Sequence, residues 1–133
     1  MCILFLALQQ HPRYPLLVGA NRDEFHERPT AFADYWDDQQ DILGGRDLRA
    51  GGTWLAVSEQ GRFAALTNLR TPSIAEGETR SRGELATDFL LYPDSNERFV
   101  KELRAKRLNY QPFNLIFGTA QTLQVYNLSL IHI

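Results

Sequence analysis

The sequence predicts an α+β fold in which two short helices separate two groups of antiparallel strands. Two observations support this prediction. Apolar runs of strand length occupy both parts of the chain, and two amphipathic segments with capping residues lie between them. Strands grouped before and after helices, rather than alternating with them, are typical of a layered fold over a mostly antiparallel sheet.

The first elements are expected to be strands at 3–8 and 16–20. Both faces of the first strand are apolar, which is typical of a strand buried between two layers. A turn at 12–15 makes the second strand its hairpin partner. The charged and aromatic stretch 21–41 is expected to be a long functional loop.

A second hairpin is expected in the middle of the chain. Segments 53–58 and 62–68 flank the turn Glu59-Gln60-Gly61. The preceding glycine pairs, Gly44-Gly45 and Gly51-Gly52, are expected to let the chain bend sharply into this hairpin.

Two capping patterns predict the helices. After a loop over 70–80, Ser81 and Glu84 form a capping box that opens the first helix, and Asp94 and Glu97 repeat the pattern before the second. The remaining strands are expected at 113–117 and 123–128.

Composition restricts the class of protein. A chain of 133 residues is about one domain long, and its 44% hydrophobic and 23% charged residues are ordinary for a globular protein. The net charge of -2 gives no reason to expect a nucleic-acid partner. A single cysteine excludes an internal disulfide, which makes the cytoplasm the default location. No stretch approaches the roughly 20 apolar residues of a transmembrane segment.

The last residues, 129–133, are apolar and lack a polar tail. An exposed apolar edge is a poor end for a sheet. We therefore expect residues 1–133 to be a single incomplete domain, with 129–133 as a candidate for unrelated read-through sequence.

Cys2 is the residue most suggestive of chemistry. Removal of Met1 is favoured before a small second residue and would leave Cys2 with a free α-amino group. Such an amine titrates near pH ~8 and can accept the thiol's proton, so that one residue carries nucleophile and base. The alternative is that Cys2 is a small packing residue at the start of a strand.

Arg22 and Asp23 follow the second strand, whose end returns to Cys2 if the first two strands form a hairpin. We expect the two residues to pair with each other or with the N-terminus, where the guanidinium would favour the thiolate. A surface ion pair is the alternative. The nearby Glu24, His26 and Glu27 lack the spacing of metal ligands, so no metal is expected.

Asn68 ends the strand 62–68, where a side-chain amide can donate to a developing oxyanion or simply cap a turn. The glycine pairs match neither a phosphate loop nor a dinucleotide-binding motif, so no cofactor is expected. Basic residues in 101–107 alternate with a glutamate and indicate a solvated helix face rather than a nucleic-acid surface.

A set of motifs resembles the NRDE family, whose eukaryotic members are called transport-and-Golgi-organisation proteins. The resemblance runs in order from Cys2 to about Phe117. The motifs are Cys2, Asn21-Arg22-Asp23-Glu24, Arg28-Pro29, Gly44-Gly45-Arg46-Asp47, Gly51-Gly52-Thr53-Trp54-Leu55, Gly61-Arg62-Phe63, Thr67-Asn68-Leu69-Arg70 and Ser81-Arg82-Gly83.

The resemblance implies the αββα sandwich of the N-terminal nucleophile hydrolases, with only its N-terminal part present. It also implies that Cys2 is the nucleophile, that Arg22 and Asp23 support it, and that Asn68 is the candidate oxyanion donor.

Two functions remain open at this point. The first is a Cys-dependent amide (C–N) hydrolase of a small unidentified substrate, acting without a cofactor. The second is a non-enzymatic carrier or trafficking factor that handles haem or lipid-derived metabolites, in which Cys2 is a ligand or a relic. Retention of Met1 would favour the carrier, because it blocks the base.

Overall fold

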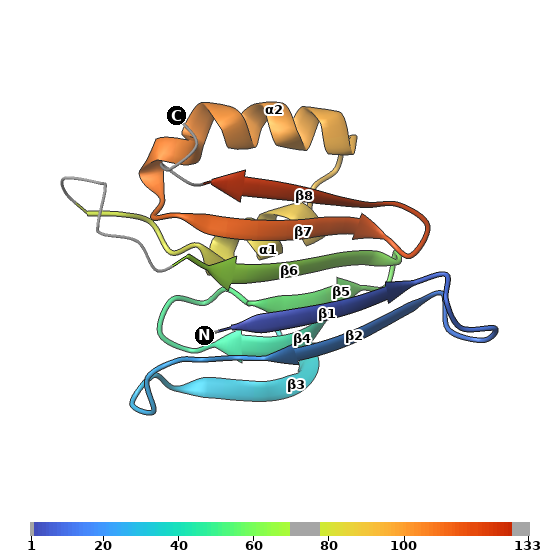
Figure 1. Cartoon of the computed structure of the whole chain (residues 1–133). Helices are drawn as coiled ribbons and strands as arrows, with labels where there is room; N and C mark the ends of the chain where they lie inside the picture. Colours follow the sequence, from blue (N-terminus) through green and yellow to red (C-terminus); the bar gives the residue numbers. More distant parts are fainter. Residues whose placement is uncertain (1, 70–77, 129–133) are drawn as a thin grey trace.

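A six-stranded antiparallel sheet forms the central layer of the computed structural model, which describes residues 2–69 and 78–128 (Figure 1). Its strand order follows the chain. The strands are β3 (Thr30–Trp36), β4 (Gln39–Asp47), β5 (Leu55–Ser58), β6 (Arg62–Asn68), β7 (Phe113–Thr119) and β8 (Leu123–Leu128). The predicted α+β class with a mostly antiparallel sheet is confirmed, as are the hairpin β5–β6 and the final pair β7–β8.

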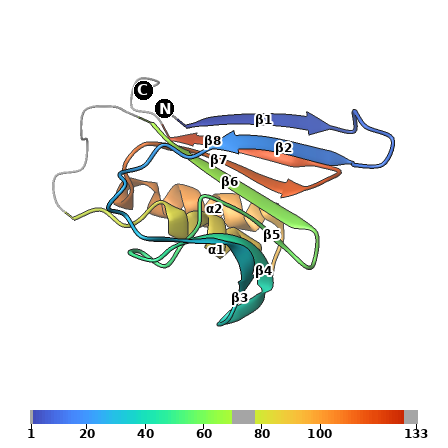
Figure 2. The ribbon, with the colours of Figure 1, turned by 90° about the horizontal axis from the view of Figure 1, so that it is seen from below.

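The remaining elements cover the two faces of this sheet. The hairpin of β1 (Ile3–Leu8) and β2 (Leu16–Asn21) is a separate two-stranded sheet stacked on one face. Helices α1 (Gly83–Leu90) and α2 (Asn96–Lys106), with the short 3-10 turn Arg107–Asn109, lie on the other. Figure 2 shows the order of hairpin, sheet and helices at β6, β7 and β8, with β3 and β4 curving round past the helices.

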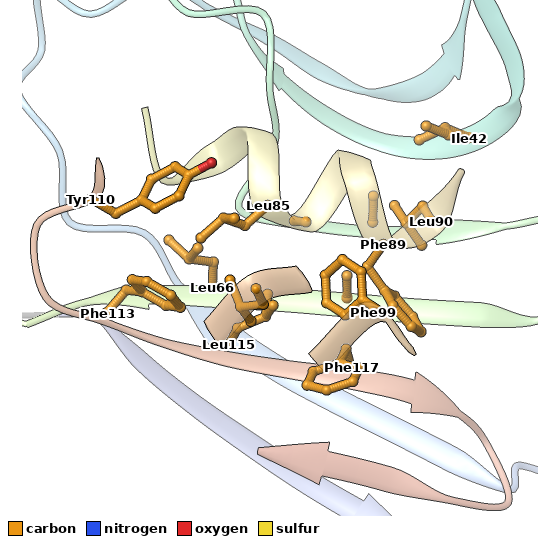
Figure 3. Packing of buried hydrophobic residues seen from close by; sticks show 14 of the residues in the cluster. Ile42, Leu66, Leu85, Phe89, Leu90, Phe99, Tyr110, Phe113, Leu115 and Phe117 are labelled. Carbon is orange, nitrogen blue, oxygen red and sulfur yellow. The ribbon is translucent and has the colours of Figure 1, made fainter. Parts of the chain in front are cut away.

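The main hydrophobic core lies between the sheet and the helices. Because side chains alternate along a strand, every second residue of β6 and β7 points toward the helices. The rings of Phe89, Phe99 and Phe117 meet edge to face, with centroids 5.0 to 5.4 Å apart. Each is at most 2% exposed (Figure 3). This aromatic cluster joins both helices to β7.

Arg62 attaches α1 to the sheet from the first position of β6. Its guanidinium donates to the carbonyl oxygens of Phe89 at 2.9 Å, Asp94 at 3.2 Å, and also Tyr92. The last carbonyls of a helix lack partners within the helix and carry partial negative charge. Arg62 therefore binds one carbonyl in the last turn of α1 and two in the segment that follows it.

The β1–β2 hairpin has one covered face and one open face. On one face Leu4 and Leu8 are partly buried and Leu6 is 37% exposed, whereas Ile3 and Phe5 on the other face are 41% and 70% exposed. The expected burial of β1 on both sides is therefore not seen among the described residues. At its far end the hairpin is tied to the β7–β8 turn, where Gln9 Nε2 donates to the carbonyl oxygen of Ala120 at 2.9 Å.

The expected loop over 21–41 was wrong. Thr30–Trp36 is strand β3, and β4 already begins at Gln39. β3 is an edge strand with two register shifts against β4, and Phe32 and Tyr35 on it are 96% and 53% exposed. Edge strands tolerate polar and irregular sequences, which hides them from a search for apolar alternation.

The helix caps also differ from the prediction. Ser95, not Asp94, caps α2, because its side chain accepts from the backbone N–H of Arg98 at 3.3 Å. The N-cap of α1 is Arg82, without a side-chain cap, and Glu84 instead binds Arg80 and the Tyr110 hydroxyl. Most of the expected 70–80 loop, and the suspected read-through at 129–133, lie outside the described residues.

Candidate functional site

A small pocket lies where the open end of the β1–β2 hairpin meets β5 and β6. Its volume of about 20 Å³ has room for roughly one water molecule. The wall is largely apolar and includes Leu4 and Ala65. Its chemically distinctive members are Cys2, Arg22, Trp54 and Thr67.

Hairpin pairing brings Asp23 back to Cys2, as predicted. Ile3 is paired with Asn21, and the Ile3 N–H donates to Asn21 Oδ1 at 2.6 Å. One step beyond this pair, the backbone N–H of Asp23 donates to Cys2 Sγ at 3.3 Å. The half-buried thiol is thus held by main chain, which any residue at 23 other than proline can supply.

Arg22 stacks on Trp54 and pairs with Glu24. Its guanidinium carbon lies 4.1 Å from the centroid of the Trp54 ring, and Nη2 lies 3.8 Å from Glu24 Oε2. Arg22 and Asp23 were expected to pair with each other or with the N-terminus, and Met1 lies outside the described residues. Arg22 instead pairs with Glu24, past the end of β2 at Asn21. Gly45 makes room for the indole, since a Cβ there would lie 2.7 Å from the Trp54 ring.

Arg28 and Asp47 form a second charged pair beside this site. Arg28 donates to Asp47 Oδ2 through Nε at 2.9 Å and Nη2 at 2.5 Å, and Asp47 Oδ1 accepts from the Arg49 N–H at 3.0 Å. Burial acts to raise the pKa of Asp47, but these hydrogen bonds outweigh it and the pKa is lowered. The pair ties the segment after β2 to the glycine-rich turn that follows β4.

Arg82 adds a further positive charge near Cys2. The first residue of α1, Gly83, packs directly against the backbone of Gly52. Only glycine fits at position 52, because a Cβ there would lie 2.5 Å from the Gly83 carbonyl carbon. Arg82 Nη1 donates to the Pro112 carbonyl oxygen at 2.8 Å. Burial lowers the pKa of Arg82, while the Glu24 carboxylate acts to raise it and the charge of Arg28 to lower it. The sequence signal for this residue is the Ser81-Arg82-Gly83 motif, which by itself indicates no chemical role.

Asn68 does not line the pocket, although the preceding residue, Thr67, does. Asn68 is paired with Phe113, whose side chain belongs to the core beneath the helices. Since paired residues share a face, Asn68 points away from the hairpin side on which Cys2 lies. The structure therefore brings together Cys2, Arg22 and Asp23, but not Asn68.

Residues 2–69 and 78–128 contain no cluster of three or more His, Cys, Asp or Glu side chains arranged to hold a metal ion. Within the same ranges, neither helix has the length and apolar character needed to cross a membrane.

Comparison with known proteins identifies the family. The family model described as transport and Golgi organisation 2 matches residues 1–132. The chain belongs to this family. A human transport and Golgi organization protein 2 homolog is 39% identical over 129 residues, covering 92% of this chain and 46% of the human protein. The mouse homolog is 38% identical with the same coverage.

A more distant relative gives the same result. Transport and Golgi organization protein 2 of Drosophila melanogaster is 33% identical over 132 residues, covering 87% of this chain and 45% of the fly protein. The chain thus spans a little less than half the length of these relatives. The transport and Golgi organisation 2 family match includes Cys2, Arg22, Asp23 and Asn68, and it also includes Trp54, Thr67 and Arg82.

Proposed function

We propose that this transport and Golgi organisation 2 chain carries the nucleophile of a Cys-dependent amide hydrolase acting on a small substrate. The observation behind the proposal is the position of Cys2 Sγ in the wall of a pocket at the open end of the hairpin, 3.3 Å from the Asp23 N–H. A thiol at such a position is fixed, partly accessible and attached to the residue whose α-amine becomes free when Met1 is removed.

The mechanism uses only the substrate, Cys2 and water. Sulfur attacks the amide carbonyl carbon while the α-amine takes the thiol proton. The C–N bond then breaks, the amine product leaves with that proton, and a thioester remains on Cys2. Water adds to the thioester with the α-amine as base, the C–S bond breaks, and the thiol recovers its proton as the acid leaves.

Arg22 and Asp23 are proposed to support this chemistry by different means. Asp23 positions the sulfur through its backbone N–H. Arg22, held on Trp54 and paired with Glu24, keeps a positive charge at the wall of the pocket. For the oxyanion donor, the family resemblance favours Asn68, whereas the face on which Asn68 lies favours its neighbour Thr67.

The same proposal extends to the fold. In a four-layer αββα sandwich, two sheets pack face to face between two helical layers. The β1–β2 hairpin on the six-stranded sheet, with helices behind, supports assignment of the hairpin to a second sheet. The exposed Phe5 would then contact a further layer.

The test is capture of the thioester in the full-length protein. N-acyl-p-nitroanilides with acyl chains of increasing length serve as substrates, and the N-terminal peptide is analysed by mass spectrometry. We expect the acyl group on Cys2 and release of p-nitroaniline, both lost in Cys2→Ala. Recovery of a mature N-terminus at Met1, or hydrolysis that survives Cys2→Ala, would refute the proposal.

A matched control separates nucleophile from base. A short N-terminal extension that cannot be cleaved keeps the thiol of Cys2 but converts its amine into an amide. We expect this form to react with thiol reagents yet to form no thioester from the anilides. Equal turnover with and without the extension would show that the α-amine is not the base.

A carrier or trafficking factor is the second candidate, because the similar proteins are named for transport and Golgi organisation. Such a carrier would bind haem or lipid-derived metabolites. Under this function Cys2 binds a ligand without turnover. Stoichiometric binding of such a ligand that is lost in Cys2→Ala, with no thioester from any anilide, would favour it.

A further inference from the structure

A row of three polar side chains crosses the hairpin-facing side of the six-stranded sheet. Thr67 in β6 is paired in register with Asn114 in β7, and Asn114 with Asn127 in β8. Directly opposed residues of antiparallel strands share a face. Asn114 Nδ2 donates to Thr67 Oγ1 at 3.2 Å, and Asn127 Nδ2 donates to Asn114 Oδ1. The three residues thus form one continuous hydrogen-bonded row.

The row interrupts an otherwise apolar surface. The next row on the same face consists of Ala65, Ile116 and Val125, which are paired across the same three strands. Asparagine is depleted from strands, because short polar side chains neither pack well on a pleated surface nor favour extended backbone. Apolar β-branched residues would pair these strands equally well, so strand pairing alone does not account for two adjacent asparagines.

One end of the row lies in the wall of the Cys2 pocket. Thr67 lines that pocket, and its oxygen accepts from Asn114. Within residues 2–69 and 78–128 the hydroxyl hydrogen of Thr67 has no hydrogen-bond acceptor, so it remains available as a donor. Each amide in the row donates toward Thr67, and hydrogen bonds in series polarise one another. The arrangement strengthens a donor beside the thiol.

The other end of the row is open. Thr67 and Asn114 are half-buried, Asn127 is exposed, and the neighbouring Val125 is 67% exposed. Two steps between adjacent strands span about 10 Å, which matches about three residues of an extended chain at 3.3–3.6 Å each. Each asparagine amide uses one donor and has a further N–H for a ligand.

We propose that the Thr67–Asn114–Asn127 row is a ligand subsite that selects short peptide-like amides, about three residues long, for the thiol of Cys2. The Thr67 hydroxyl donates to the carbonyl oxygen next to the sulfur, and the two asparagines bind amide groups further along the ligand. The inference rests on the proposed function for the reacting thiol, but ligand selection by the row is measurable apart from hydrolysis.

The experiment compares two alkylating reagents of similar length on the full-length protein with Met1 removed. Chloroacetyl-glycyl-glycinamide has amide groups along its length, whereas N-hexylchloroacetamide has an apolar tail. In both, Cys2 sulfur displaces chloride from the chloroacetyl carbon and the thiol proton passes to solvent. Rates are divided by those with free glutathione. We expect the peptide-like reagent to be preferred by about tenfold, since a net gain of one or two hydrogen bonds has that size.

Isosteric or exposed substitutions test each part of the row. Asn114→Leu should reduce the preference by about fivefold, and Asn127→Leu, at the exposed end, should reduce it without risk to folding. Thr67→Val should instead slow both reagents by about fivefold, because both carry the carbonyl group that the Thr67 hydroxyl binds. Ile116→Val on the same face is the matched control and should leave the preference unchanged. Methyl methanethiosulfonate, which has no carbonyl group, should modify Cys2 at the same rate in all variants that are folded.

The outcomes separate this subsite from the hydrolase. A preference that is absent in the wild type, or unchanged in Asn127→Leu and Asn114→Leu, overturns the subsite and leaves the row a strand-pairing feature. A preference that depends on the row while no anilide forms a thioester supports the subsite and refutes hydrolysis. Thioester formation with no dependence on the row supports hydrolysis and overturns the subsite.

Discussion

The two faces of the six-stranded sheet differ in how completely they are covered. On the helix face, Phe89, Phe99 and Phe117 are at most 2% exposed. On the hairpin face, Val57 and Val125 are 39% and 67% exposed. The thiol of Cys2, the stacked Arg22 and the polar row Thr67–Asn114–Asn127 all belong to the second face. Because strand side chains alternate, one sheet has its tightly packed core on one side and its candidate chemistry on the other.

The largest effect is expected on the helix face. Phe117→Ala should lower the free energy of unfolding by about 3–5 kcal/mol, because it removes a fully buried ring and leaves a cavity among Phe89 and Phe99. Urea denaturation followed by circular dichroism measures the loss. Ile116→Ala, the neighbouring position on the hairpin face, should cost less than half as much. If Ile116→Ala and Phe117→Ala lowered the free energy of unfolding equally, the two faces of the sheet would not differ in how tightly they are packed.

A smaller effect is expected at the ion pair beside the site. Asp47→Asn should lower the free energy of unfolding by about 1–3 kcal/mol, because Asp47 is 7% exposed and Arg28 loses its hydrogen-bonded partner. Thermal denaturation at neutral pH is the measurement. Asp38→Asn is the control, since Asp38 pairs with Arg46 at a site where its side chain is 59% exposed. If Asp38→Asn lowered the free energy of unfolding as much as Asp47→Asn, burial of the ion pair would not determine how much it stabilises the fold.

The same residue gives a pH dependence of known sign. The pKa of Asp47 is lowered in the folded state, so its stabilising effect is fully present above the ordinary carboxyl pKa of about 3.9. The effect is lost as the pH falls through the lowered value. The difference in melting temperature between wild type and Asp47→Asn should therefore shrink as the pH falls toward about 3. A constant difference across this range would contradict the assignment to Asp47.

A weaker effect is expected at Arg22. Arg22→Ala should cost about 0.5–1 kcal/mol, the usual worth of a cation–π contact at a partly exposed site, and should make the Trp54 ring more accessible. Acrylamide quenching of tryptophan fluorescence reports that accessibility. Arg22→Lys keeps the charge but loses the planar stacking. It should resemble Arg22→Ala in quenching, whereas unchanged quenching in both variants would mean that the guanidinium does not shield the indole.

The smallest effect is expected at the sheet edge. Phe32→Ser should change the free energy of unfolding by less than about 0.5 kcal/mol, because the ring is 96% exposed on β3. Urea denaturation again provides the measurement. A loss as large as that of Phe117→Ala would place Phe32 in a contact outside the described residues.

The sequence was most informative where local patterns and packing agree. The β1–β2 and β5–β6 hairpins and both helices follow from apolar periodicity and turn residues. Strand β3 could not be predicted in this way, because it is an edge strand with exposed aromatic residues and lacks a continuous apolar face. The predicted return of Asp23 to Cys2 was correct, since hairpin register fixes it.

Side-chain partners were less predictable than backbone register. Arg22 pairs with Glu24 in the segment after β2, and it stacks on Trp54, where Gly45 leaves space for the ring. Neither contact is visible as a local pattern. The Thr67–Asn114–Asn127 row depends on registers between strands up to 47 residues apart, as in the bond from Asn114 to Thr67. Such registers are products of the whole fold.

The bond between Gln9 and Ala120 has a consequence for the order of events during synthesis. The two residues are 111 positions apart, so at roughly 5–20 residues per second a ribosome needs about 6–22 seconds to add the second after the first. The β1–β2 hairpin forms within microseconds of its own synthesis, but it cannot dock at its far end until β7 and the following turn have been translated. The open end of the hairpin has no such delay, because the residues that line the Cys2 pocket have all been translated once Thr67 has been added.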